Sequence, residues 1–430
     1  MPDAAERRSA IVRETPSHRG DADECGRARK PTGRPTGNGS TPVTDAVWIV
    51  EAYPWDEKPM AGVFYQTQAR ALARLGVNLT ATCPTPMAPW PLPRLDARWR
   101  RYAAAPRDAL DEGVRVVRPR YLGVPREPRW ACPDRLVARA AWRSRDAWTG
   151  ARLIHGHTAV FGLAAWRLAR RTGLPFVLTF HGGDLNVWPD RHPDRLSDLR
   201  TAAREARAVI AVSEALASRA RELTGVNAIH LPLGSDHRSL AALALPRDVA
   251  RAALDLVDDR VIVLFVGNLI ATKGVRELID AILPRGDRFL GVFVGDGPER
   301  GYGGADARAT GCLRFPGLRP HGEIARYMSA ADVLVLPSYG EGLPTVLVEA
   351  GSLGLPVIAS AVGGIPDLLG ADRGVLLAEV SPGAIGAALD AFETGRSAAS
   401  AAAARLRAFV LTEHDVDASA ARLLEIYRLR

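Results

Sequence analysis

The chain contains very little lysine, although it carries a surplus of positive charge. Only three of its 56 Lys and Arg residues are lysine, namely Lys30, Lys58 and Lys273. A GC-rich genome explains such an arginine bias, and a lysine kept in this background is a candidate for a chemical role. The formal net charge of +8 suits an anionic partner, such as a sugar nucleotide, a lipid pyrophosphate, a phospholipid surface or nucleic acid.

Cysteines and long apolar runs are also scarce. The four cysteines are Cys25, Cys83, Cys132 and Cys312. They show no Cys-x-x-Cys spacing, which argues against a zinc site or a disulfide framework and favours a reducing compartment. No apolar run approaches the roughly 20 residues that a membrane span needs. The N-terminal stretch MPDAAERRSAIVRETP lacks the apolar segment of a signal peptide, so we expect a cytoplasmic protein.

The pattern of strands and helices predicts two α/β units. A length of 430 residues favours two or three domains, and residues 1–43 are polar without apolar periodicity, which predicts a disordered tail or a start assigned too far upstream. Near-continuous Val, Ile and Leu runs then alternate with helical patterns on both sides of residue 245, as in parallel sheets covered on both faces. The predicted strands are residues 47–50, 77–83, 153–155, 176–180, 208–212, 261–267, 290–297, 332–338 and 355–360.

Helical patterns between these strands cover residues 63–75 and 163–171, and Ser213 is the expected N-cap of a further helix. Residues 241–258 have the character of a connector. Two doubly wound halves that face each other form a cleft, and ligands bind at the carboxyl ends of their strands. Polar residues that follow a strand are therefore the candidates for chemistry.

The first such candidate is the turn FVGNLIATKGV, residues 265–275. A helix predicted to start near Gly274 offers unpaired N–H groups to a phosphate, and Lys273 adds a full charge. An ordinary turn with a solvent-facing lysine explains the same pattern. The later GDGPER, residues 295–300, is more simply a tight turn.

A second candidate is PSYGEGLPTVLVEAGSLGLPVIAS, residues 337–360. Glu341 lies in a glycine-rich turn after a strand, and Glu349 lies in the helix that follows. A carboxylate can accept two hydrogen bonds from vicinal hydroxyls, as on a ribose. The apolar neighbours of Glu349 argue against a solvated helix face, because a buried carboxylate is rare without a partner.

These motifs together resemble the family 4 glycosyltransferases, which are retaining, metal-independent enzymes with two facing Rossmann-like domains, the GT-B architecture. The E-x7-E signature of the family falls at Glu341 and Glu349, within LRFPGLRPHGEIARYMSAADVLVLPSYGEGLPTVLVEAGSLGLPVIASAVGGIPDLL. Further matches are VGNL…KGV, VGDGPE, AGVFYQTQARALARLG, LIHGHTAVFGLAAWRLARRTGLPFVLTFHGGD, AVIAVSEALA and LPLGSD. The resemblance implies an acceptor-side domain at 44–245, a nucleotide-sugar-binding domain at 246–412, and a C-terminal helix at 413–430 that packs back on the first domain.

The resemblance also implies roles for single residues. His181 would contact the donor sugar, Lys273 would neutralise the diphosphate leaving group, and Glu341 would lie beside the transferred sugar. Glu349 would bind the ribose hydroxyls. The remaining implied positions are Gly62 and Asn268 on the donor, Gly342 and Leu343 for N–H groups toward the sugar or phosphate, and His157 and Asp184 on the acceptor side, with His157 at the edge of the cleft.

Two positions depart from the family pattern. Asn268 stands where many members carry an arginine, so that one of the usual two phosphate cations is missing. Its replacement would have to be Arg276, Arg314 or Arg319. Leu233 stands where many members carry an asparagine, in the loop LPLGSD.

The activity that the resemblance implies is retaining transfer of a hexosyl group from a nucleotide diphosphate sugar to a hydroxyl of a glycan, glycolipid or small molecule. The family is thought to use front-face attack, in which the leaving phosphate takes the acceptor's proton, so no general base is named. We expect no cofactor and no metal, since neither Asp21-x-Asp23 in the tail nor Asp415-x-Asp417 near the C-terminus suits a metal site. The alternatives are a nucleotide-sugar epimerase and a non-catalytic partner that keeps the fold.

Other classes of function have weaker support. No recognised nucleic-acid module is present, and a pyridoxal phosphate enzyme would need a buried Schiff-base lysine, for which Lys273 in a phosphate loop is a poor candidate. Residues 90–148 mix tryptophans with many arginines, a combination that can dock on an anionic bilayer. We therefore weigh peripheral contact with the inner face of the plasma membrane against a basic surface with ordinary core tryptophans. The tryptophans are Trp90, Trp99, Trp130, Trp142 and Trp148, and the arginines include Arg94, Arg98, Arg100, Arg101, Arg118, Arg120, Arg126 and Arg129.

Overall fold

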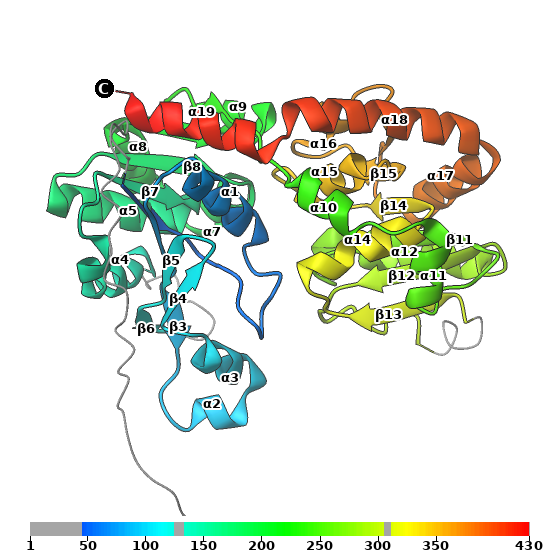
Figure 1. Ribbon diagram of the computed structural model, residues 1–430, viewed down its shortest axis with the longest axis horizontal. Helices are drawn as coiled ribbons and strands as arrows, with labels where there is room; N and C mark the ends of the chain where they lie inside the picture. Colours follow the sequence, from blue (N-terminus) through cyan, green and yellow to red (C-terminus); the bar gives the residue numbers. More distant parts are fainter. Residues whose placement is uncertain (1–44, 124–132, 305–310, 430) are drawn as a thin grey trace, which may run out of the picture. The chain divides into compact units, whose positions relative to one another are not determined.

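The computed structural model describes residues 45–123, 133–304 and 311–429 (Figure 1). The predicted tail at residues 1–43, Cys25, Cys132 and Trp130 lie outside these ranges. The elements of the first half are β1 (Ala46–Ile49), α1 (Val63–Arg74), β2 (Leu79–Thr82), β3 (Thr85–Met87), α2 (Leu92–Leu95), α3 (Ala97–Ala104), β4 (Asp108–Asp111), β5 (Val114–Val117), β6 (Arg120–Leu122), α4 (Pro133–Arg143), η1 (Arg145–Trp148), β7 (Leu153–His157), α5 (Thr158–Thr172), β8 (Phe176–Phe180), α6 (Gly183–Asn186), α7 (Trp188–Arg191), η2 (Pro193–Arg195), α8 (Leu196–Glu205), β9 (Ala208–Ala211), α9 (Glu214–Thr224), β10 (Ile229–His230) and α10 (His237–Leu243).

The second half continues the alternation of strands and helices. Its elements are α11 (Arg247–Ala253), β11 (Val261–Val266), η3 (Ala271–Lys273), α12 (Val275–Ile282), η4 (Leu283–Arg285), β12 (Phe289–Val294), β13 (Leu313–Gly317), α14 (His321–Ala330), β14 (Val333–Leu336), α15 (Thr345–Ser352), β15 (Val357–Ser360), α16 (Ile365–Leu369), β16 (Val375–Leu377), α17 (Pro382–Thr394), α18 (Arg396–Glu413) and α19 (Val416–Arg428).

Two sheets form the centres of the two halves. Within the described residues, the first sheet has the order β10-β9-β8-β7-β1-β2-β5-β4, and the second has the order β13-β12-β11-β14-β15-β16. All pairs are parallel except β4 with β5. Parallel strands need a crossover between them, and helices supply it here. The α/β fold with two doubly wound sheets is thus confirmed.

The apolar runs predicted the central strands well. The strand predicted at residues 176–180 is β8 exactly as bounded, and the other predicted strands differ from the observed ones by a few residues at their ends. Ser213 is the N-cap of α9, because its hydroxyl accepts a hydrogen bond from the N–H of Leu216 at 3.2 Å. The helix predicted at residues 163–171 starts earlier, at Thr158, which has a positive φ of 64°.

The region between β2 and α4 was not predicted. It holds the short pair β3–β6, the helices α2 and α3, and the strands β4 and β5 at one end of the first sheet. Its first part, CPTPMAPWPLP, is rich in proline and has no apolar period, so it gave no strand or helix signal.

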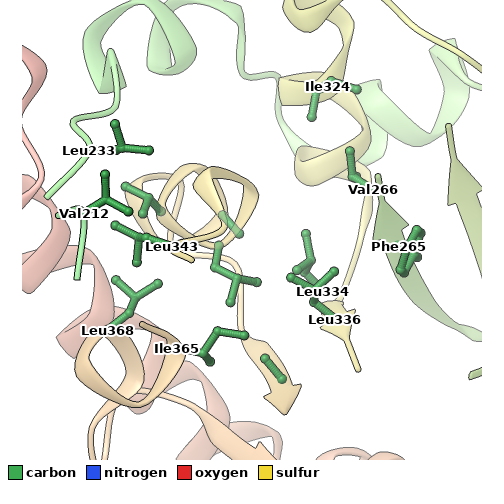
Figure 2. Close-up of a cluster of buried hydrophobic side chains, with 14 of the residues drawn as sticks. Val212, Leu233, Phe265, Val266, Ile324, Leu334, Leu336, Leu343, Ile365 and Leu368 are labelled. Atoms are coloured by element: carbon green, nitrogen blue, oxygen red, sulfur yellow. The ribbon is translucent and has the colours of Figure 1, made fainter. Parts of the chain in front are cut away.

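One large cluster of buried apolar side chains contains residues of both halves. Val212 and Leu233 belong to the first half, and Leu343, Ile365 and Leu368 belong to the second (Figure 2). Leu233 is buried in this cluster, so the apolar residue at this position has a packing role.

The C-terminal helix α19 contacts α1 and belongs to the core beneath the first sheet. The indole N–H of Trp48 in β1 donates to the hydroxyl of Tyr427 at 2.7 Å. The domain boundaries at residues 43, 245 and 412 stay predictions; residue 245 lies between α10 and α11. No helix of the described residues has the length and apolar character needed to cross a bilayer.

Candidate active site

A cavity of about 360 Å³ is lined by loops that follow strands of both sheets. In the first half, the start of α1, the turn after β8 and Leu233 line this cavity. In the second half, the turns after β11, β12 and β14 line it. Among its lining residues are Met60, Val63, Phe64, His181, Leu233, Gly267, Asn268, Lys273, Arg319, His321, Glu341, Gly342, Leu343, Thr345 and Glu349. The positions where strand ends meet are those at which parallel α/β sheets bind ligands.

Lys273 and Glu341 form an ion pair inside this cavity. The ammonium Nζ of Lys273 lies 2.5 Å from Oε1 of Glu341, and the hydroxyl of Ser338 donates to the same oxygen at 2.7 Å. The two side chains are only 24% and 9% exposed. The pair brings together a cation and a carboxylate that are 68 residues apart, and it fixes the position of the ammonium group in the cavity.

The glycine-rich turn after β14 offers backbone N–H groups to the cavity. Among the described residues, no hydrogen-bond acceptor is recorded for the N–H of Gly342 or Leu343. Helix α15 starts directly after them without a side-chain cap, and its first residues Thr345 and Val346 line the cavity. The sequence had pointed to the N-terminus of α12 instead. Of the turn before α12, Gly267, Asn268 and Lys273 line the cavity, but the first residue of α12 does not, whereas the first residues of α15 do. The positive end of α15 is therefore directed at the cavity.

Gly342 touches the turn after β8 so closely that no side chain fits. A Cβ at this position would lie 1.7 Å from the carbonyl oxygen of His181, whereas a Cβ at Gly340 in the same turn would meet nothing within 4 Å. We expect Gly342→Ala to lower kcat/KM by at least about tenfold, since a misplacement of about 1 Å can cost 100-fold. Gly340→Ala is the matched control and should stay within twofold of the wild type. Equal kinetics for both variants would contradict this account of the turn.

Glu349 is buried in α15 and faces His321 at the start of α14. Its Oε1 lies 3.0 Å from Nε2 of His321, and among the described residues no protein partner is recorded for Oε2. Burial lowers the pKa of His321, but the charge and hydrogen bond of Glu349 outweigh this effect, so the pKa lies above the ordinary 6.5. One carboxylate oxygen of Glu349 thus remains available to a ligand.

The His321–Glu349 pair predicts a pH-dependent stability. A folded-state pKa above the unfolded value gives a stabilisation that is complete below pH 6.5 and is lost as the pH rises through the folded pKa. We expect the difference in unfolding free energy between the wild type and His321→Gln to be largest at pH 6 and to shrink toward pH 9. Urea unfolding at both ends of this range measures it, and a difference that grows with pH would contradict the pairing.

Arg319 is a candidate for the cation that is missing at Asn268. Both residues line the cavity, and among the described residues Arg319 forms no recorded ion pair and its buried Nε has no hydrogen-bond partner. Arg276 instead pairs with Glu299. Arg314 donates to the backbone carbonyl of Gly311. Of the three alternatives left open by the sequence, the structure supports Arg319.

The ring of His181 contacts the ring of a second histidine, His157. Nε2 of His181 lies 3.0 Å from Nδ1 of His157, and burial lowers the pKa of His181 to about 3 and that of His157 well below 6.5. Both rings are therefore neutral and share one proton between these atoms. Within the described part of the chain, Nδ1 of His181 has no hydrogen-bond partner, so it keeps a hydrogen-bonding site for a ligand in the cavity.

The prediction that His157 lies at the cleft edge is wrong. The side chain is 0% exposed and does not line the cavity. Strand β7 ends at His157, and the alternation of side chains along the strand turns it inward, where its ring contacts His181. Its contribution is to position His181.

His155 and Tyr427 of the C-terminal helix extend this contact, and the sequence analysis named neither residue. The ring of His155 stacks on His157 at 4.0 Å between centroids. Its Nδ1 lies 2.6 Å from the hydroxyl of Tyr427, and its Nε2 lies 2.7 Å from Oγ1 of Thr179. The alternating HGH pattern in an otherwise apolar strand was the available signal, because it puts two histidines on one face.

Asp184 was predicted on the acceptor side, but its carboxylate accepts hydrogen bonds from backbone N–H groups of its own loop. Oδ1 accepts the N–H of Gly182 at 2.6 Å, and both oxygens accept the N–H of His181 at 3.0 and 3.1 Å. Burial raises the pKa of Asp184 to about 6, although these hydrogen bonds oppose the shift. Asp184 is absent from the cavity lining, so it holds the turn that presents His181.

Gly62 has a local reason to be glycine. Its φ is +75°, and a Cβ would lie 2.6 Å from the carbonyl oxygen of Ala52. It forms the last residue before α1, whose first residues Val63 and Phe64 line the cavity. An approach of its own backbone to the donor stays a prediction.

Both carboxylates of the second Asp-x-Asp sequence, Asp415-x-Asp417, contact other groups of the protein. Asp415 caps α19 by accepting the N–H of Ala418 at 2.8 Å, and Asp417 pairs with Arg74 at 2.6 Å. Asp21 and Asp23 lie outside the described residues.

Solved structures with the same arrangement of elements are glycosyltransferases. The sucrose-phosphate synthase of Thermosynechococcus elongatus superimposes with a TM-score of 0.74 at 22% identity, over 90% of this chain and 98% of that one. HepE of Anabaena superimposes with a TM-score of 0.67 at 17% identity, over 89% and 98%. The fold is that of the GT-B glycosyltransferases.

Sequence comparison gives the family. The model "Glycosyltransferase Family 4" matches residues 61–233, and "Glycosyl transferases group 1" matches residues 246–408. The teichuronic acid biosynthesis glycosyltransferase TuaC of Bacillus subtilis is 35% identical over 351 residues, which cover 81% of this chain and 88% of that protein. The 2-deoxystreptamine glucosyltransferase of Streptomyces kanamyceticus is 33% identical over 235 residues, 50% and 60% of the two chains. The chain belongs to glycosyltransferase family 4, as the resemblance predicted.

Proposed function

We propose that this glycosyltransferase moves a hexosyl group from a nucleoside diphosphate sugar to a hydroxyl, with retention of the anomeric configuration and without a metal ion. The observation that carries the proposal is the cavity in which Lys273, Arg319 and the start of α15 present positive charge opposite Glu349. The relatives support a sugar donor of this kind, since HepE was solved with UDP-glucose. The name of TuaC connects that protein with a cell-wall polysaccharide, which favours a glycan or lipid-linked acceptor here.

The donor would lie with its ribose at Glu349 and its diphosphate at the N-terminus of α15. Oε2 of Glu349 is available for a ribose hydroxyl, and charge-assisted hydrogen bonds of this kind are short and strong. Lys273 and Arg319 would neutralise the diphosphate, which replaces the metal ion that other transferases use. The sugar would then lie beside Glu341, within reach of Nδ1 of His181.

In the proposed reaction the bond between C1 of the sugar and the phosphate oxygen breaks, and the acceptor oxygen forms a bond to C1 on the same face. The acceptor proton passes to the leaving phosphate oxygen, so that charges balance without a protein base. Lys273, Arg319 and the N–H groups of Gly342 and Leu343 stabilise the charge that develops on the leaving group, and such fixed donors are often the largest contribution to catalysis.

The stereochemistry can be tested with water as the acceptor. The enzyme is incubated with α-linked UDP-, GDP- and ADP-sugars in EDTA, and the released sugar is followed by proton NMR before mutarotation. We expect slow release of the α anomer with one nucleotide class. First appearance of the β anomer, or release that needs added Mg²⁺, contradicts the proposal.

Peripheral contact with an anionic membrane is a separate part of the proposal, and exposed side chains near α2 support it. Trp99 and Trp148 are buried, whereas Trp90 is 75% exposed beside the exposed Leu92 and Arg94. Exposed apolar and cationic side chains on α2 and just before it suit an anionic lipid surface.

We expect the protein to co-sediment with phosphatidylglycerol vesicles at low salt, and Trp90→Ser to bind these vesicles much more weakly. Val257→Ser, at a 79% exposed position elsewhere, is the control. Equal binding of the two variants would remove α2 from the contact.

A further inference from the structure

A second cavity, of about 200 Å³, lies on the other side of the loop that lines the donor cavity. This loop joins β1 to α1. Met60 of the loop lines the donor cavity, whereas Trp55, Lys58 and Ala61 of the same loop line the second one. The two cavities thus share one wall, and a ligand in the second cavity lies next to the sugar-binding end of the first half.

The second cavity combines aromatic rings with cations. The Nζ atom of Lys58 lies 3.8 Å from the ring centre of Tyr102 and 5.5 Å from that of Trp55. The guanidinium of Arg98 lies 5.5 Å from the ring centre of Trp99. Among the described residues, neither Lys58 nor Arg98 forms a recorded ion pair with a carboxylate. Cations held over aromatic rings without a carboxylate remain available to an anionic ligand.

Glu51 supplies a hydrogen-bonding group at the end of β1 in the same cavity. Its side chain is accessible to solvent, yet protein surrounds it on most sides. This desolvation, with the charge of Asp184 as a smaller cause, raises the pKa of Glu51 to about 7. Near neutral pH the carboxyl group therefore exists in both forms and can accept or donate a hydrogen bond to a hydroxyl.

We propose that this cavity is an acceptor subsite for one sugar unit that carries an anionic group, a carboxylate or a phosphate. The sugar's apolar face would pack on Trp55 and Tyr102, its anionic group would contact Lys58 and Arg98, and a hydroxyl would bond to Glu51. The volume is below the roughly 300–1,000 Å³ of sites for drug-sized ligands, which suits a single unit. The inference rests on the proposed transferase activity, since it gives that reaction its acceptor class.

Lysine is rare in this chain, and Lys58 is one of the three that remain. Arginine would carry the same charge as a broad planar fork, whereas the ammonium of lysine is a compact point charge. A lysine retained at this position fits a cation that contacts both an aromatic ring and a small anion.

Saturation-transfer NMR on the full chain tests the proposal with three probes: glucuronate, glucose 6-phosphate and glucose. We expect signals from one or both anionic probes in the presence of saturating nucleotide, and at least a fivefold weaker signal from glucose. Lys58→Met, which keeps the side-chain length, should weaken anionic-probe binding about tenfold, the effect of one charged hydrogen bond. Arg98→Gln should act in the same direction. Arg101→Gln, an exposed charge on α3 outside the cavity lining, is the matched control.

The outcomes separate this inference from the transferase proposal. A signal with only one anionic probe supports the subsite and identifies its anion as carboxylate or phosphate. Equal signals from glucose, signals unchanged in Lys58→Met, or signals abolished by nucleotide would overturn it. If nucleotide binds and no anionic probe does, the subsite fails alone; if no nucleotide binds, the transferase proposal fails first. Thermal melting of each variant shows that it is folded.

Discussion

Lys273→Met should reduce kcat by about 100- to 1,000-fold, with a much smaller rise in donor KM. The ammonium is fixed 2.5 Å from Glu341 in the cavity, and in the proposed reaction the charge of the diphosphate develops there during bond breakage. Removal of one preorganised donor to such a charge costs about 2.7–4 kcal/mol in turnover. Single-turnover kinetics with a saturating nucleotide sugar measure the effect on the chemical step.

Loss of Lys273 also leaves Glu341 without its cationic partner, so a stability effect has to be separated from catalysis. The double variant Lys273→Met/Glu341→Gln removes the unpaired carboxylate, and we expect it to recover Tm without recovering kcat. A third variant, Lys273→Arg, keeps the charge and should lie between the wild type and Lys273→Met. If Lys273→Met turns over within twofold of the wild type, Lys273 does not stabilise the leaving group.

Glu349→Ala should weaken donor binding about 10- to 100-fold and change kcat by less than about threefold. The buried carboxylate accepts hydrogen bonds, and a bond to a charged group contributes about 1.5–3 kcal/mol, where 1.4 kcal/mol is tenfold in affinity. In the proposed binding mode the ribose contacts are equal in the ground and transition states, so their loss would appear in KM. Calorimetric titration with the nucleoside diphosphate alone isolates this contribution.

The variant also removes the partner of His321, which is why His321→Gln is the necessary control. This substitution keeps a hydrogen-bonding group near Oε1 of Glu349 and leaves Oε2 untouched, so we expect at most a few-fold loss in donor affinity. A loss in His321→Gln as large as that in Glu349→Ala would assign the effect to the pair and not to ribose binding by Glu349.

The central strands, and the position of Lys273 and Glu349 at one cavity, could be predicted from the sequence because each carries a local signal. Continuous apolar runs are typical of buried parallel strands, and the residues that follow them lie at the strand ends where ligands bind. Glu349 stood out because its neighbours in the helix are apolar. Lys273 stood out because lysine is so rare in this chain.

The missed features depend on contacts between distant residues. The bond between His155 and Tyr427 joins positions 272 apart in the chain, and no local pattern marks such a pair. His157 ends a strand and Asp184 follows one, as expected of functional residues. The side chain of His157 points inward and contacts His181, whereas the carboxylate of Asp184 binds backbone N–H groups of the turn that holds His181. Arg319 could not be chosen over Arg276 before it was known that Glu299 pairs with Arg276.

The region around α2 and α3 was difficult to predict from the sequence for a different reason. Its prolines interrupt every apolar period, so the sequence gave no indication that Trp99 is buried and Trp90 is exposed. The same region supplies Arg98 and Tyr102 to the second cavity, which is therefore invisible to motif analysis.

The central claim is that the cavity binds a nucleoside diphosphate sugar without a metal ion. A thermal-shift panel of UDP, GDP, ADP and their common sugars, in EDTA and in Mg²⁺, tests it most directly. At 100 times Kd a ligand stabilises the folded protein by about 2.7 kcal/mol. We predict a clear shift with one base, equal in EDTA and Mg²⁺ and much smaller in Glu349→Ala at the same ligand concentration. No shift with any nucleotide, or a shift only with Mg²⁺, would contradict the account.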